Sequence, residues 1–192
     1  MNVPRTAWSV AAAAVLSLAL PGAAPAADPQ LCGACHGPDG NSTMPAMPSL
    51  AGQPAQFIST QLFQFREGNR KDAQMTPVAK TLSNADMNEL ARHFSRQKPA
   101  PPTHKTAPEN TAAGRQLAER FNCVQCHGPA LVGVQHIPRL AGQQYEYLKT
   151  QLRGFKAQTR ADLDGNMTSA AQPLSDKDIE VLADYLAGLG AP

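Results

Sequence analysis

All four cysteines of the chain lie in two Cys-x-x-Cys-His motifs, Cys32–Cys35–His36 and Cys123–Cys126–His127. On a helical turn, positions i, i+3 and i+4 share one face, so each motif can present two thiols and an imidazole together. The two thiols can each add to one vinyl group of a haem, and the histidine can then coordinate the iron. This pattern is the signature of covalent c-type haem attachment. The sequence therefore predicts two haem c groups.

Paired cysteines also occur in zinc sites, thioredoxin-like dithiols and disulfide-bonded secreted domains. A four-cysteine zinc site usually has its pairs about 15–20 residues apart, whereas these pairs lie about 90 residues apart. A redox dithiol belongs in a βαβ context, and no strand-like alternation stands out in this sequence. Neither the dithiol nor the disulfide alternative explains the histidine directly after each pair.

The first 26 residues have the features of a secretory signal peptide. Arg5 precedes an uncharged apolar stretch from Ala7 to Leu20, and Ala24-Pro25-Ala26 supplies small residues for cleavage. The apolar stretch is shorter than the roughly 20 residues that span a bilayer. We therefore expect export and cleavage near Ala26 rather than an anchor helix.

The remaining sequence is an internal repeat, because further segments match in the same order after each haem motif. They are Pro48–Gln53 with Pro138–Gln143, Met75-Thr76 with Met167-Thr168, and Leu82-Ser83 with Leu174-Ser175. Two copies indicate a domain duplication. Between them, four prolines in residues 97–108 favour an extended spacer. We predict domains at 27–98 and 109–192, joined by a linker at 99–108.

The haem iron needs a ligand opposite the histidine, and the repeat selects a methionine for each half. Met167 is the one methionine after the second motif, and it aligns with Met75. The alignment favours Met75 over Met44 and Met47, which lie in a proline-rich loop, and over Met87, which we expect in the core. Core filling remains the ordinary role of a methionine. Three histidines without counterparts are predicted to be surface or packing residues: His93, His104 and His136.

Pro48 and Pro138 follow the two motif histidines by about a dozen residues. A ligating histidine usually donates its second ring N–H to a backbone carbonyl, which orients the ring. The chain could return at these prolines and supply that carbonyl. By spacing alone, an ordinary turn proline is an equally good interpretation.

The elements that must position these residues are helical. Ser83 and Ser175 are expected N-caps, each followed by an acidic residue in the first turn and by apolar residues at helical spacing. Residues 54–67 and 144–157 form a second matched pair of helices, and residues 109–122 predict a helix that leads into the second motif. The first half has only about five residues between Ala26 and Cys32, so its leading helix must be very short.

This ordered set of motifs resembles the di-haem cytochromes c4 of bacterial periplasms. The resemblance covers nearly all of the chain after residue 26 and implies an all-α protein with two tandem class I cytochrome c domains, packed with their haem propionate edges close together. It implies axial ligation by His36 with Met75 and by His127 with Met167. It also supports Pro48 and Pro138 as carbonyl partners of the histidines. The short lead-in to Cys32 departs from the longer N-terminal helix usual in that family.

Histidine plus methionine would fill both axial positions of each iron, which leaves no vacant position for a substrate. Outer-sphere electron transfer, rather than catalysis, is then the expected function. We expect a periplasmic carrier between a bc1-type complex and a terminal oxidase. The alternatives are a dedicated electron-accepting subunit of a periplasmic dehydrogenase or flavoenzyme and, less favoured, a di-haem peroxidase.

The charge of the chain narrows the range of partners only slightly. A formal net charge of +2 is too small to indicate nucleic acid or a membrane surface as the main partner. Redox proteins are the expected partners, with room for a peripheral association with the membrane, and no nucleic acid. We expect a monomer.

Overall fold

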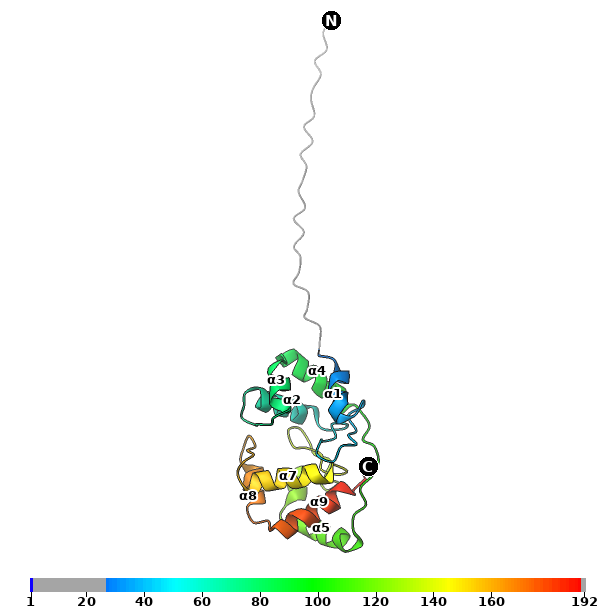
Figure 1. Cartoon of the computed structure of the whole chain (residues 1–192), viewed down its shortest axis with the longest axis vertical. Helices are drawn as coiled ribbons and strands as arrows, with labels where there is room; N and C mark the ends of the chain where they lie inside the picture. Colours follow the sequence, from blue (N-terminus) through cyan, green and yellow to red (C-terminus); the bar gives the residue numbers. More distant parts are fainter. Residues whose placement is uncertain (2–26, 191–192) are drawn as a thin grey trace.

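The computed structural model describes Met1 and residues 27–190, and in this part of the chain the structure is helical (Figure 1). The elements are α1 Pro29–His36, α2 Ala55–Arg66, α3 Met75–Lys80, α4 Asn84–Ser95, α5 Pro108–Arg120, α6 Cys123–His127, α7 Tyr145–Lys156, α8 Asn166–Ala171 and α9 Asp176–Ala187. Apart from an isolated bridge between Val134 and Ile137, no β-pairing occurs within the described residues. The expected all-α fold is confirmed. The proposed signal segment, 1–26, lies outside the described residues except for Met1.

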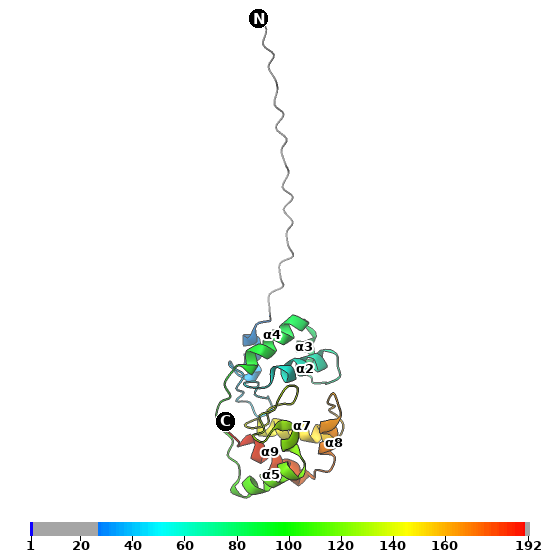
Figure 2. The same ribbon diagram turned by 180° about the vertical axis from the view of Figure 1, so that it is seen from behind.

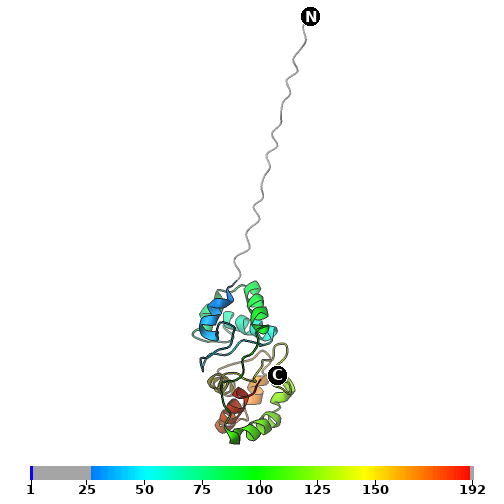
Figure 3. The same cartoon turned by 90° about the vertical axis from the view of Figure 1, so that its right-hand side faces the viewer.

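The helices gather into two halves, each with its own core. Figure 1 places α1–α4 in one half and α5–α9 in the other, and the view from the side in Figure 3 keeps them separate. In the first half α2 packs on α4, where Met87 is a core residue as predicted. In the second half α5 and α7 both pack on α9, around Ile179 and Leu182.

The predicted serine caps are present as full capping boxes. At α4 the Ser83 hydroxyl accepts from the Asp86 backbone N–H at 3.1 Å, and the Asp86 carboxylate accepts from the Ser83 N–H at 2.9 Å. Ser175 and Asp178 repeat both bonds at the start of α9. Each box satisfies two backbone donors that the first turn of a helix leaves without partners.

The two halves enter their haem motifs differently. In the second half α5 ends at Arg120, and Asn122 takes a left-handed φ of 58° before α6 begins at Cys123. In the first half α1 starts at Pro29, only three residues before Cys32, and Asp28 caps it by accepting from the Gln30 N–H. The very short lead-in expected from the sequence is confirmed.

The segment between the halves has no regular secondary structure, but it is hydrogen-bonded to the second half. The Asp184 carboxylate on α9 accepts from His104 Nε2 at 2.6 Å and from the Ala107 N–H at 3.0 Å. The His104 ring also stacks on Tyr145, with ring centroids 5.1 Å apart. His104 is thus a packing residue, as predicted, and the linker is fastened to the second half. Among the described helices, none is long and apolar enough to cross a membrane.

The halves face each other through α2 and α7 and through the loops after the haem motifs, as Figures 1 and 2 show from opposite sides. Arg70 donates to Tyr147 at 3.1 Å and to Gln151 at 3.0 Å in the second half. Arg160 donates back to Gln61 in the first half at 3.4 Å. Arg70 and Arg160 occupy matching positions in the repeat, so the contact is close to two-fold symmetric.

Candidate functional site

The first haem motif is carried by α1. Cys32 is half-buried, Cys35 is exposed, and His36, the last residue of the helix, is buried. Neither cysteine takes part in a disulfide. Burial raises the pKa of the Cys32 thiol, which keeps it protonated at neutral pH. Because both thiols lie one turn apart on one short helix, they are available on a common face.

The second motif repeats this arrangement on α6. Cys123 is half-buried, Cys126 is exposed, and His127 is 3% exposed. Neither cysteine is in a disulfide, and burial raises the pKa of Cys123. The two motifs are therefore equivalent in their local geometry, although different elements precede them.

Each motif histidine is oriented by a backbone carbonyl. His36 Nδ1 lies 2.8 Å from the Pro48 carbonyl oxygen, and His127 Nδ1 lies 2.8 Å from that of Pro138. A carbonyl oxygen only accepts, so Nδ1 carries the proton in both rings and Nε2 keeps its lone pair. Burial lowers the pKa of both histidines, more than the carbonyl bond raises it. Both imidazoles are therefore neutral, and each can donate the Nε2 lone pair to a metal.

Local backbone turns bring the two prolines to the histidines. The Gly40 carbonyl accepts from the backbone N–H groups of Leu50, at 2.7 Å, and Ala51, at 3.0 Å. In the second half the Leu131 carbonyl accepts from Leu140 and Ala141 at 2.8 and 3.1 Å. Gly40 and Leu131 both have positive φ, of 80° and 57°. These bonds close each loop, so that the proline two residues before the first donor, Pro48 or Pro138, is held beside its motif histidine.

Met75 opens the short helix α3, and Met167 is the second residue of the equally short α8. Met75 and Cys32 both pack against the core of the first half, and Met167 and Cys123 both pack against that of the second. Of the competing methionines, Met44 is 46% exposed. The structure thus brings one thioether and one haem motif to the same core in each half.

Two aspartates that the sequence analysis did not single out hold the methionine segments. The Asp72 carboxylate accepts from the Met75 N–H at 2.8 Å, and the Asp162 carboxylate accepts from the Met167 N–H at 2.8 Å. The side chain of Asp162 also binds Thr168. Both aspartates occupy matching positions in the repeat, and that correspondence is the signal that could have identified them.

The donor set in each half fits a covalently bound haem. Two free thiols share one helical face, a neutral imidazole has one nitrogen held and the other available, and a thioether packs on the same core. Thiol, imidazole and thioether are the groups by which c-type haem is attached and ligated.

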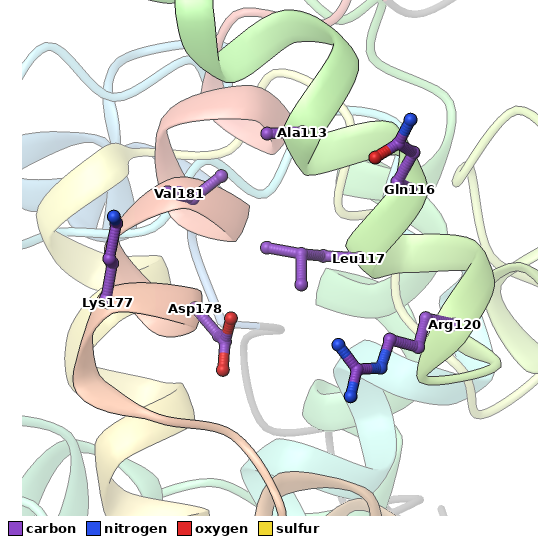
Figure 4. A pocket seen from close by; sticks show the side chains of 7 residues that line it. All are labelled: Ala113, Gln116, Leu117, Arg120, Lys177, Asp178 and Val181. Atoms are coloured by element: carbon purple, nitrogen blue, oxygen red, sulfur yellow. The ribbon is translucent and has the colours of Figure 1, made fainter.

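Two grooves on the described part of the surface lie away from these residues. A groove of about 360 Å³ runs between α5 and α9, where Leu117 and Val181 form its wall and Arg120 and Asp178 lie at one end (Figure 4). A second groove, of about 650 Å³, lies beside α3 and is lined in part by Asp72 and Thr76. Neither groove contains a cysteine, histidine or methionine of the candidate sites.

Comparisons with known proteins agree with this geometry. The Cytochrome c family model matches twice, at residues 23–98 and 111–190. Cytochrome c4 of Pseudomonas aeruginosa is 37% identical, over 83% of this chain and 84% of the relative. The thiosulfate dehydrogenase electron acceptor of Thiomonas intermedia is 36% identical, over 95% and 90%. The crystal structure of reduced recombinant cytochrome c4 from Pseudomonas stutzeri superposes with a TM-score of 0.78 at 35% identity, covering 83% of this chain and 94% of that one.

Proposed function

Because this chain belongs to the cytochrome c family, as a tandem-domain electron-transfer protein of the cytochrome c4 type with two haem c groups, we propose that it carries electrons from a bc1-type complex to a terminal oxidase. It is an electron-transfer protein rather than an enzyme. The observation that supports electron transfer is the doubled geometry, in which a carbonyl-held histidine and an anchored methionine belong to each half.

The proposed attachment residues are Cys32 and Cys35 for the first haem and Cys123 and Cys126 for the second. His36 and His127 would be the iron ligands on the motif side, through Nε2. The hydrogen bonds to Pro48 and Pro138 support this assignment because they fix the tautomer that leaves Nε2 free. The same bonds would hold each imidazole ring in one orientation in both the Fe(II) and the Fe(III) states.

Met75 and Met167 are the proposed ligands on the opposite side. Haem c with histidine and methionine ligands supplies a one-electron Fe(II)/Fe(III) couple at raised potential. The bonds from Asp72 and Asp162 to the methionine backbones anchor the segments that carry the thioethers. An anchored ligand moves little when the charge of a site changes, which favours fast outer-sphere transfer.

The proposal includes location and organisation. Residues 1–26 would direct export to the periplasm, and the domains would span 27–98 and 109–192, with the linker at 99–108. The docked position of His104 and Ala107 on α9 supports a linker that fixes one arrangement of the halves. We propose a monomer that docks to redox proteins, with at most a peripheral association with the membrane.

A substitution series tests the ligand assignment. The Met167→Ala and Met75→Ala variants should each lose the near-infrared Met–Fe(III) charge-transfer band of one haem only. Met87→Leu is the matched control, because Met87 is buried in the core of the first half, and it should keep both bands. Persistence of both bands in Met167→Ala would refute the assignment. Rapid cyanide binding by the ferric wild type would instead favour the peroxidase alternative.

A second candidate is a dedicated electron acceptor for a thiosulfate-oxidising dehydrogenase. The Thiomonas intermedia relative, which covers nearly all of this chain, is such an acceptor by name. Reconstituted turnover separates the two functions. Reduction by a thiosulfate dehydrogenase at a rate far above that by a bc1-type complex, with co-purification at fixed stoichiometry, would favour the second candidate.

A further inference from the structure

The matching segments Pro48–Gln53 and Pro138–Gln143 meet at the interface between the halves. The Gln53 side chain bonds to the backbone of Arg139, accepting from its N–H at 2.9 Å and donating to its carbonyl at 3.0 Å. The Gln143 side chain does the same to the backbone of Ser49, at 2.7 and 3.0 Å. Each glutamine thus bonds to the residue after the proline of the other half. The interface therefore has a pseudo-two-fold axis.

One position breaks this symmetry. Ser49 in the first half corresponds to Arg139 in the second, and Arg139 is only 3% exposed. Its guanidinium donates to the Ala51 carbonyl at 2.9 Å and also to the Ala141 carbonyl. Ala51 and Ala141 are equivalent residues of the repeat. A group that bridges two equivalent carbonyls lies close to the pseudo-two-fold axis, so this cation belongs to both halves.

No acidic side chain neutralises Arg139 within the described residues. The ion pairs of residues 27–190 involve other basic side chains, and Arg139 Nε is buried without any hydrogen-bond acceptor there. Burial lowers the pKa of Arg139 to about 10, so the guanidinium is still protonated at neutral pH. A full positive charge is therefore buried at the centre of the molecule.

This charge lies next to the histidine hydrogen bonds of both halves. Arg139 directly follows Pro138, whose carbonyl accepts from His127. Its Nη2 binds Ala51, three residues after Pro48, whose carbonyl accepts from His36. Loss of an electron from either iron adds a positive charge, and a buried cation opposes that addition because charges are screened poorly in a protein interior.

We propose that Arg139 is a single buried cation shared by the two haem sites, which raises the reduction potentials of both together; this rests on the proposed ligation. The position on the pseudo-axis makes the effect on the two sites comparable. If a haem propionate carboxylate lies against the unpaired Nε, the loss of Arg139 should still lower both reduction potentials, because removal of the cation would then expose that negative charge to the irons.

Redox titration of the holoprotein tests the proposal. Both midpoint potentials should fall in Arg139→Gln and in Arg139→Met, by amounts within about twofold of each other. The expected size is about tenfold in the equilibrium constant for reduction, equivalent to about 59 mV for a one-electron couple. Arg139→Met keeps the apolar stem of the side chain and covers the case in which the glutamine variant does not fold.

Two controls separate the effect of the Arg139 charge on the potentials from the effect of the interface hydrogen bonds. Gln53→Met removes the two bonds to the Arg139 backbone without changing the charge, so it should leave both potentials in place. Lys177→Gln removes an exposed lysine of α9, and any shift should vanish at high salt, whereas that of Arg139→Gln should persist.

The possible results are distinct. Unchanged potentials in the Arg139 variants, a shift of one haem only, or an equal shift in Gln53→Met would each overturn the proposal. The proposed function would instead be overturned if the wild type did not take up two electrons, one per haem, or if the Met75 and Met167 variants kept both methionine bands.

Discussion

The two interface glutamines offer a direct test of how the halves are held together. In Gln53→Met and Gln143→Met, the side-chain length is kept while both cross-interface hydrogen bonds of that side chain are lost. Both glutamines are buried, at 1% and 4% exposure, and their partner backbones at Arg139 and Ser49 are buried as well. Each variant therefore leaves at least one N–H and one C=O of the other half without a partner.

The expected loss in the free energy of unfolding follows from the number of these unpaired groups. A buried polar group that loses its partner costs about 1–3 kcal/mol, so two such groups give roughly 2–4 kcal/mol once partial relaxation is included. Gln143→Met should be the more destabilising of the two, because Gln143 Oε1 also accepts from the Gln144 N–H at 2.9 Å. The double variant should lose less than the two losses together, because opening the interface once removes both sets of bonds.

Urea unfolding of the holoprotein, followed by far-UV circular dichroism, measures these losses. We expect a lower midpoint in each variant and, in the double variant, separate transitions for the two halves. Gln116→Met is the matched control, since Gln116 is exposed on α5, and it should change stability by less than about 0.5 kcal/mol. Losses below that value in both interface variants would refute the reasoning that these bonds hold the halves together.

Three further predictions concern the second half. Gly114→Ala should destabilise it by about 1–3 kcal/mol in thermal unfolding, although alanine is the better helix former, because a Cβ at Gly114 would lie 2.6 Å from Tyr185 Cγ on α9; a stabilised variant would contradict this packing. Ser175→Ala should cost about 0.5–2 kcal/mol at neutral pH. The Ser175 hydrogen bonds hold the pKa of Asp178 below its usual 3.8, so the part of this deficit that comes from the hydroxyl-to-carboxylate bond is present above about pH 3.8 and lost as pH falls through the lower folded value. The bond that the hydroxyl accepts from the Asp178 N–H does not titrate, so a smaller deficit should remain at pH 2; a deficit equally large at pH 2 would be inconsistent with the capping box. Asp184→Ala removes the acceptor of His104, Ala107 and Asn110, so trypsin should cut at Lys105 faster than in the wild type, as mass spectrometry of timed digests would show, and an unchanged rate would mean that other contacts fasten the linker.

The helices that the sequence predicted are those whose signals are local. Ser83 and Ser175 precede an acid at the third helical position, and apolar residues then recur at helical spacing, so cap, charge and periodicity all agree. The haem motifs are equally local, because three chemical groups lie within five residues. Such features need no knowledge of the rest of the fold.

The residues that the sequence did not identify act across longer separations. Asp72 and Asp162 are exposed or half-exposed polar residues in loops, and nothing in their neighbourhood distinguishes them from solvated charges until they are seen to accept from the methionine backbones. Arg139 is harder still to identify. A basic residue after a proline is ordinarily on the surface, and its burial depends on carbonyls of Ala51 and Ala141 that meet only when the halves pack.

Among the helices of residues 27–190, α5 of the second half is the one that has no counterpart in the first half. In the second half α5 covers α9, contributing Ala118 to the core, with Leu117 and Phe121 packed beside it. Within residues 27–190 no helix of the first half precedes α1, and there the Ala27 N–H donates to Asp86 Oδ1 at 2.9 Å, so the capping carboxylate of α4 also holds the start of the described chain. The hydrogen bonds from Ser83, and the smaller one from Ala27, keep the pKa of Asp86 below its ordinary value. A single aspartate therefore ties the lead-in of α1 to α4, a role that the equivalent Asp178 does not need because α5 already covers α9.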